Sequence, residues 1–228
     1  FKFPIIVKPT DRSGSRNIMK LESTDGLLKA IKEACETSFE KKAIVEEYLE
    51  GNEYSMETIS SNGVHHFLAT TKKYTTGETA HKQPSDLSPE IEKKAIDVIM
   101  KALDALHIEN SAGHSEFKVD SNGNIHIIEI GARMGGDCIG SDLVYLSTGN
   151  DFIKMVIDVA CANELEFAEN PTHKEVQIHF MFTQEDLDKL EEIKKNNPEC
   201  LYRVSDIEYE NIGNVKDSGT RLGYYITV

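Results

Sequence analysis

Several residue types and patterns are scarce in this chain. Its 228 residues include no tryptophan and only four cysteines, at positions 35, 138, 161 and 200. No two cysteines form a CxxC pair, and no histidine stands at a zinc-ligand spacing from them. This excludes a zinc ribbon and a disulfide framework, and it is typical of a reduced cytoplasmic protein.

Long apolar runs and an excess of basic residues are also absent. No hydrophobic stretch approaches the roughly 18 residues that span a bilayer, and no signal-peptide pattern is visible. The chain has 39 acidic against 25 basic residues, a formal net charge of −14. Such a charge repels phosphate backbones and anionic lipid, which excludes general nucleic-acid or membrane-surface binding.

The first twenty residues run against this acidic background. They contain Lys2, Lys8, Arg12, Arg16 and Lys20, and only one acidic residue. Two interpretations remain open at this point. The stretch is either a solvated basic edge or a site that holds a small anion.

The hydrophobic pattern predicts a mixed α+β chain in two layers. Helices are expected over 24–35 and 89–106, in two stretches up to about 165, and after a capping box that begins at Thr183. Residues 72–88 form a polar segment without a predicted strand, and Pro171 marks a boundary. Strands are expected at 5–8, 43–49, 54–59, 64–71, 175–182, 201–209 and 221–227, with a clear hairpin over 113–130.

That hairpin brings two carboxylates together. If Asn122-Gly123 forms a two-residue turn, Glu116 lies opposite Glu129 and Lys118 lies opposite Ile127. Opposed like charges destabilise a sheet by up to about 1 kcal/mol, so something positive is expected between them. Mg²⁺ with a phosphate suits two carboxylates, and the alternative is a slipped register with both glutamates in solvent.

His114, two residues before Glu116, superficially suggests a zinc deaminase. That class also requires a Pro-Cys-x-x-Cys motif, which the sequence lacks. The deaminase interpretation is therefore rejected.

Four segments, taken in order, resemble the ATP-grasp superfamily over nearly all of the chain. Each is a weak motif alone, but their shared order is a strong signal. They are Pro4–Pro9 with the loop Asp11–Ile18, Val45–Gly51 with Glu53–Glu57, Glu116, and Glu129–Arg133.

The resemblance implies a set of nucleotide-binding residues. A strand lysine and a small-residue loop would hold the phosphates, a hinge would present main-chain groups to adenine, and an acid would bind ribose. The alternative for the strand lysine, Lys8, is an ordinary surface position, and the alternative for the hinge residues Tyr48 and Leu49 is that they belong to the core. These residues are Lys8; Ser13, Gly14 and Ser15; Glu46, Glu47, Tyr48 and Leu49; and Glu53.

It also implies a metal and catalytic set. Glu116 and Glu129 would bind Mg²⁺. Arg133, His81 and Lys82 would assist phosphoryl transfer. The alternatives are that Arg133 is a surface residue and that the His-Lys pair belongs to an ordinary loop. Two departures from the family pattern stand out. Gly131 replaces an asparagine metal ligand, and the phosphate loop has one glycine instead of several.

Within the superfamily, the chain is most similar to the carbamoyl-phosphate-synthase-like and L-amino-acid ligase branch. Three segments carry this similarity: His81–Asp86, Glu129–Gly136 and Val215–Tyr224. The implied architecture is an α+β ATP-grasp fold, in which two subdomains (1–53 and 54–170) clasp ATP and a small β-rich subdomain (171–228) follows. An upstream domain is expected to be absent from this chain.

The implied activity is ATP-dependent and Mg²⁺-dependent ligation. ATP would convert a small carboxylate, such as that of an amino acid, into an acyl phosphate that an amine then attacks, with release of ADP. Two alternatives stay open: a carbamoyl-phosphate-synthase-like enzyme that uses bicarbonate and ammonia, and a non-catalytic ATP-binding fragment. The expected partners are small molecules in the cytoplasm, and a homodimer is left open.

Overall fold

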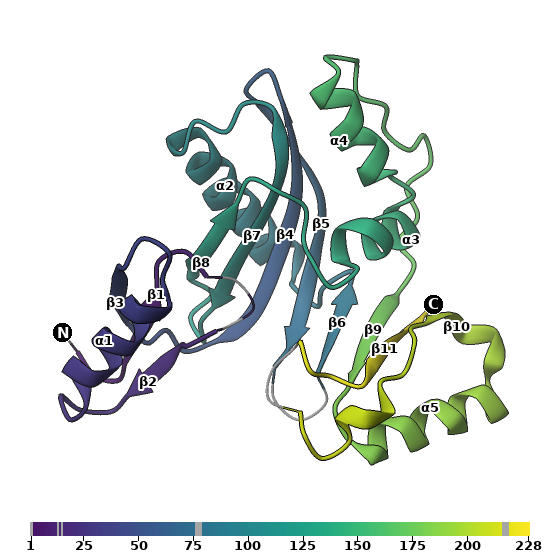
Figure 1. Ribbon diagram of the computed structural model, residues 1–228. Coiled ribbons are helices and arrows are strands. Elements are labelled where there is room, and N and C mark those ends of the chain that lie inside the picture. The colour runs from purple at the N-terminus through teal and green to yellow at the C-terminus, as the bar shows by residue number, and fades with distance from the viewer. Residues whose placement is uncertain (1, 13, 15, 76–78, 216–218) are drawn as a thin grey trace. The chain divides into compact units, whose positions relative to one another are not determined.

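The computed structural model describes residues 2–12, 14, 16–75, 79–215 and 219–228 (Figure 1). The chain divides into two compact units. The first comprises Phe1–Glu50 with Asn214–Arg221, and the second comprises Gly51–Gly213 with Leu222–Val228. In the described part of the chain, none of the helices has the length and hydrophobicity of a membrane span.

The first unit is a small antiparallel sheet with one helix. The strands β1 (Ile5–Pro9), β2 (Met19–Leu21) and β3 (Ala43–Glu47) lie in the order β2-β1-β3. Helix α1 (Leu27–Thr37) covers this sheet and buries Ala30 and Ala34 against Val7. The helix begins three residues later than predicted, after Gly26, which takes a left-handed conformation (φ 78°), and Leu28 in its first turn is exposed.

The second unit is built on an eight-stranded antiparallel sheet. Its order is β10-β11-β9-β6-β5-β4-β7-β8, so the C-terminal strands continue the sheet that the hairpins begin. The strands are β4 (Asn52–Ser61), β5 (Val64–Tyr74), β6 (Ala80–Gln83), β7 (Ser111–Val119), β8 (Ile125–Gly131), β9 (Val176–Met181), β10 (Leu201–Val204) and β11 (Gly223–Thr227).

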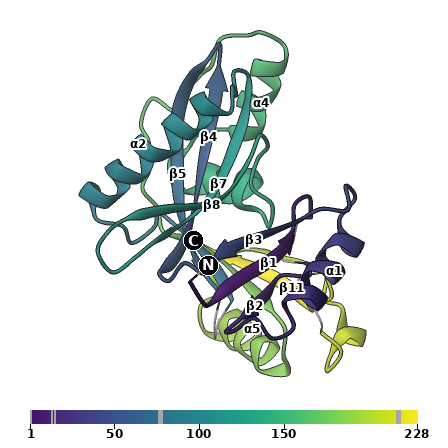
Figure 2. The ribbon, with the colours of Figure 1, turned by 90° about the vertical axis from the view of Figure 1, so that its left-hand side faces the viewer.

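Helices cover both faces of this sheet. Helix α2 (Pro89–Ala105) begins at the N-cap Ser88 and packs Ala95, Ile99 and Leu103 against Phe117 of β7. Leu106, one residue past the end of α2, is exposed, whereas Leu103 is buried. The other face is covered at one end by η1 (Ile139–Leu143), α3 (Val144–Thr148) and α4 (Phe152–Ala160); Figure 2 shows α2 and α4 on opposite sides of the strands.

Strand β6 lies inside the segment that the sequence predicted to be a polar loop. It joins β5 to β9 and so connects the hairpins to the C-terminal strands. Its polar residues can be buried because they have partners: Gln83 donates to Thr71 Oγ1 (2.7 Å) and accepts from Ser147 Oγ (2.9 Å). Hydropathy alone missed this strand because the polar residues are satisfied by other elements.

The C-terminal elements follow the predicted order. Helix α5 (Gln184–Asn196) begins with the expected capping box, in which Thr183 and Asp186 bond each other's backbone N–H groups. The short helices η2 (Pro198–Cys200) and η3 (Tyr209–Asn211) flank β10. The subdomain boundaries at residues 53 and 170 stay a prediction.

The β7–β8 turn differs from the prediction. Gly123 N donates to Asp120 O (3.0 Å) and Asp120 N donates to Asn124 O (3.1 Å), which makes a three-residue loop rather than a two-residue turn. Lys118 consequently pairs with His126 and not with Ile127. A bulge at Ile128 then shifts the register by one residue, so Glu116 does lie opposite Glu129 as predicted.

Candidate active site

The candidate site is a polar stripe on one face of the second unit's sheet. Because neighbours in register share a face, β4, β5, β7 and β8 all contribute to it. Ser55 has Thr71 on one side and Glu116 on the other, and Glu116 in turn faces Glu129. The opposite face of the same strands carries the apolar cluster under α2.

Lys73 is the central cation of this stripe. Its ammonium lies 2.7 Å from Glu116 Oε1 and 3.0 Å from Glu53 Oε1, with only 13% of the side chain exposed. Burial alone would lower the pKa of Lys73, but the charges and hydrogen bonds of the two glutamates outweigh it and raise that pKa. Lys73 is therefore held as a cation between two carboxylates from different strands.

His114 is a second buried cation. Its Nδ1 contacts Glu57 Oε1 and its Nε2 lies 3.3 Å from Glu116 Oε1. Burial would lower the pKa of His114, but the hydrogen bonds and charges of the two glutamates raise it to about 9. The imidazole is thus protonated at neutral pH, and positive and negative groups alternate along the stripe.

Glu116 stays ionised in this setting. Burial would raise its pKa, but the hydrogen bond from His114 and the charge of Lys73 lower it to about 2. Its partner Glu129 is half exposed, and the guanidinium of Arg133 lies 3.9 Å away. Arg133 is also half exposed and donates through Nη1 to Met134 O (2.8 Å).

His81 and Lys82 point to opposite faces of β6. His81 pairs in register with Lys73 and is buried, and its Nδ1 donates to Ala80 O (2.9 Å). Burial, followed by the charge of Lys73, lowers the pKa of His81 to about 4, so the ring is neutral with Nε2 as an acceptor. Lys82 pairs with Glu175 (2.8 Å) and is not brought together with the stripe.

The residues predicted to bind nucleotide in the first unit lie on and beside its sheet. Lys8 Nζ is 2.6 Å from Glu46 Oε2, so two of them form an ion pair. Tyr48 follows β3 and its backbone N–H donates to Pro4 O (3.0 Å), and the Lys20 ammonium lies 4.1 Å from the centre of its ring. Gly14 has φ 70°, a conformation that favours glycine; Ser13 and Ser15 lie outside the described residues.

Glu47 ends β3 in register with Ile5, and Leu49 follows two residues later. The predicted ribose acid Glu53 belongs to the second unit, where it binds Lys73. The roles of all these residues stay predictions.

The stripe suits a magnesium ion that is shared with a phosphate. Its donors are hard carboxylate oxygens, and among the described residues no group of three or more histidine, cysteine or acidic side chains could hold a metal alone. Mg²⁺ fits this case, since it takes one or two carboxylates and completes its shell with substrate oxygens and water. Beside Glu116, the buried hydroxyl of Ser55 has no partner among the described residues, which marks a polar position suited to a ligand.

Sequence reasoning missed three residues of the stripe: Glu57, Lys73 and His114. A bulge at Leu68 in β5 puts Lys73, instead of Lys72, opposite Glu53, and neither turn nor hydropathy reveals it. His114 was noticed only as a false deaminase signal. Glu57 ends the segment Glu53–Glu57 that carries part of the family resemblance, but no role was predicted for it.

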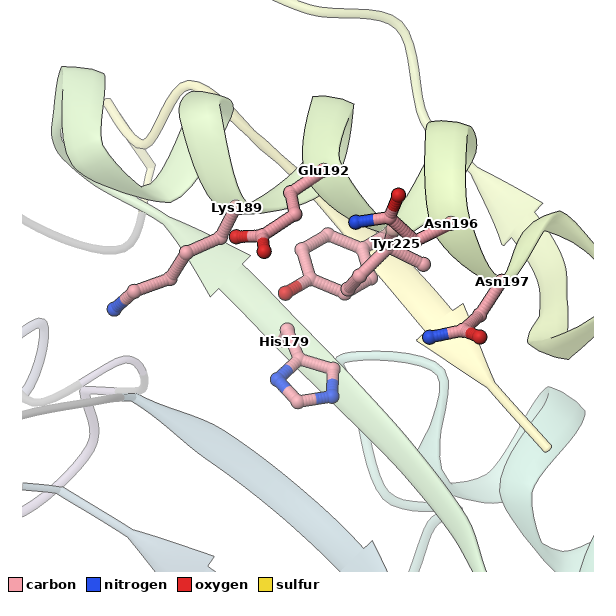
Figure 3. Close-up of a pocket in the computed structure, with 7 residues that line it drawn as sticks. His179, Lys189, Glu192, Asn196, Asn197 and Tyr225 are labelled. Carbon is pink, nitrogen blue, oxygen red and sulfur yellow. The ribbon is translucent and has the colours of Figure 1, made fainter.

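A separate pocket of about 340 Å³ lies between α5 and the opposite face of the sheet (Figure 3). His179 of β9 and Tyr225 of β11 stack at its floor, with ring centroids 4.6 Å apart. Lys189, Glu192 and Asn196 of α5 lie above these rings. None of the residues predicted for catalysis or nucleotide binding lines this pocket.

Comparison with known proteins identifies the family. The ATP-grasp domain matches residues 1–142, so the chain belongs to the ATP-grasp family. It is 28% identical over 183 residues to the alanine–anticapsin ligase of Bacillus subtilis (strain 168), covering 69% of this chain and 39% of that one. It is 25% identical over 170 residues to the D-alanine–D-alanine ligase of Pseudomonas fluorescens (strain Pf0-1), covering 71% of this chain and 52% of that one.

Solved structures confirm the predicted fold class. An L-amino acid ligase from Bacillus licheniformis superposes with a TM-score of 0.75 at 21% identity, covering 100% of this chain and 58% of that one. The α+β ATP-grasp fold is therefore confirmed. The chain spans between two fifths and three fifths of the length of these relatives.

Proposed function

We propose that the protein is an ADP-forming ligase that joins a small carboxylate, that of an amino acid, to an amine. The observation that carries this is the opposition of Glu116 and Glu129 across β7 and β8, with Lys73 and Arg133 beside them. Two relatives named as amino-acid ligases support the substrate class.

The protein's own groups would position charge more than do covalent chemistry. Lys73 and His114 keep Glu116 ionised and fixed, so it is ready to act as a ligand. Mg²⁺, when held by Glu116 and Glu129, would supply positive charge to the phosphates of ATP. Arg133 would orient the substrate carboxylate or the phosphoryl oxygens through its planar fork.

His81 is better suited to the amine than to the phosphate. A neutral ring whose Nδ1–H is used by Ala80 O can only accept at Nε2. We therefore propose that His81 accepts a hydrogen bond from the attacking amine and does not neutralise phosphate charge. Lys82, on the other face, has no part in this proposal.

The test is ADP release by the full natural protein with ATP, Mg²⁺ and pairs of amino acids, with the amide product identified by mass spectrometry. We expect one ADP per amide, and a loss of at least about 100-fold in kcat/KM for Glu116→Gln and Glu129→Gln. Glu90→Gln is the matched control, because Glu90 is an exposed acid of α2 that forms an ion pair with Lys94.

Two outcomes would contradict the proposal. ADP release that requires bicarbonate and ammonia, with no amide from any amino-acid pair, would favour the carbamoyl-phosphate-synthase-like alternative. ATP binding without any turnover by the full natural protein would favour a non-catalytic nucleotide-binding role.

A further inference from the structure

Glu57, in the middle of β4, is a fully buried carboxylate that uses both of its oxygens. Oε1 contacts Nδ1 of His114, the direct partner of Glu57 across β4 and β7. Oε2 accepts from the backbone N–H of Gly135 at 2.9 Å. Gly135 lies in the glycine-rich loop, residues 131–137, which begins at the end of β8 and carries Arg133.

One peptide group joins this carboxylate to Arg133. The peptide between Met134 and Gly135 donates its N–H to Glu57 and accepts at its C=O from Arg133 Nη1 (2.8 Å). Glu57 and the guanidinium are thus bound to the two ends of the same planar unit. A shift of that peptide would move the hydrogen-bond partner of Arg133.

The close approach requires glycine at position 135. A Cβ on Gly135 would lie 2.7 Å from Glu57 Oε1 and 2.8 Å from His114 Nδ1, and atoms of side chains do not pack that closely. A Cβ on the neighbouring Gly136 would meet nothing within 4 Å. The two adjacent glycines therefore have different reasons to be there, and only Gly135 is needed for contact with Glu57.

Water cannot easily replace these contacts. A buried carboxylate is stable only with hydrogen-bond donors in place, and Glu57 has two, one from β7 and one from the loop. His114 also reaches Glu116 through Nε2 (3.3 Å). The same pair of side chains therefore touches the glycine-rich loop on one side and the candidate metal ligand on the other.

We propose that Glu57 is a positioning residue that clamps the glycine-rich loop to the sheet through Gly135, and so fixes Arg133 relative to Glu116. The clamp itself follows from the contacts above, whereas its effect on turnover rests on the proposed function. The two parts are separated by measuring the clamp without any substrate.

Hydrogen exchange in the full natural protein tests the clamp. Glu57→Gln keeps the size of the side chain but replaces one acceptor oxygen with an NH₂ group that would face another donor. We expect the amide of Gly135 to exchange about 10-fold faster or more, while β4 and β7 keep their protection. Asp158→Asn, a buried acid of α4 that binds Lys154 and Asn163, is the matched control and leaves the loop unchanged.

A pair of glycine variants covers the case in which Glu57→Gln does not fold. Gly135→Ala should push the loop off Glu57 and raise exchange across residues 131–137, and Gly136→Ala should leave that exchange close to wild type. Equal exchange in Gly135→Ala and Gly136→Ala, or an unchanged Gly135 amide in a folded Glu57→Gln, would overturn the clamp.

Turnover tests the second part. With a displaced Arg133, Glu57→Gln should lower kcat for ADP release by about 10-fold or more while KM for ATP stays near the wild-type value. A loosened loop with unchanged kcat would refute the role in positioning Arg133. If the wild-type protein releases no ADP with any substrate, the proposed function fails, while the exchange measurements still decide the clamp.

Discussion

The two hairpins that build the polar stripe both have Asn-Gly at the tip, yet they turn differently. In β4–β5, Asn62 and Gly63 both have positive φ (52° and 76°), and Ser61 pairs with Val64, as in a two-residue type I′ turn. In β7–β8, Gly123 has φ 74° while Asn122 is not left-handed, and the loop is one residue longer.

The difference comes from the residue before the turn. Asp120 accepts from the backbone N–H groups of Asn122 (2.8 Å) and Asn124 (2.9 Å), so its side chain closes a wider loop. Ser61 makes no such contact with the backbone of its turn among the described hydrogen bonds. A turn motif is therefore read correctly only together with the side chain that precedes it.

The largest expected loss of stability comes from a substitution that removes the ionic link between the two hairpins. Lys73→Met removes the cation shared by Glu53 of the first hairpin and Glu116 of the second, and it leaves both partly buried carboxylates without it. We expect a loss of about 2 kcal/mol in the free energy of unfolding, measured with urea at pH 7.

The neighbouring lysine is the control for this measurement. Lys72 contacts Asp86, which is half exposed, so Lys72→Met should cost less than about 1 kcal/mol. Equal losses for the two variants would mean that Lys73 does not bridge the hairpins.

A smaller difference in stability is expected between alanine substitutions at the two turn glycines, Gly63 and Gly123. Gly63→Ala places a Cβ in open space, so only the left-handed backbone is penalised, by about 1 kcal/mol. Gly123→Ala carries the same penalty and also places its Cβ 2.8 Å from Cδ1 of Ile91. Thermal unfolding of both variants should therefore rank Gly123→Ala as the less stable, and the reverse order would show that the tips are not built as described.

The smallest expected effect is a pH dependence of stability that arises at the β7–β8 turn and not at the β4–β5 turn. Hydrogen bonds, first from the Asn124 side chain and backbone and then from His126, lower the pKa of Asp120 below its usual 3.8. A lowered acid pKa contributes stability above pH 3.8 that is lost as the pH falls through the folded value. The stability difference between wild type and Asp120→Asn should shrink below about pH 4, whereas Asn62→Ala should show a constant difference.

The sequence predicted most elements and the opposition of Glu116 and Glu129. Periodicity located α2 and the hairpins, and the capping box located α5, because these signals are local. Glu116 and Glu129 were paired correctly from an incorrect turn, since the longer loop and the bulge at Ile128 cancel each other. In β4–β5 the bulge at Leu68 shifts the register by one residue and so hid the pairing of Lys73 with Glu53.

What escaped prediction depends on contacts between distant segments. β6 is buried because Thr71 and Ser147 satisfy Gln83, and Glu57 is buried because His114 and Gly135 do the same for it. No local pattern contains that information. Both strands, β4 and β6, are themselves mainly polar, so hydropathy does not single out Glu57 or Gln83 as buried.

The bulge at Ile128 also makes the pairing of Glu116 with Glu129 independent of the length of the β7–β8 loop. Between the turn and the bulge, the turn determines which residues pair. Beyond the bulge the register is shifted by one residue, and Glu116 pairs with Glu129. A residue gained or lost at the tip can therefore be absorbed at the bulge while the two carboxylates stay opposed. During evolution such a hairpin can vary its exposed end without losing the chemistry at its base.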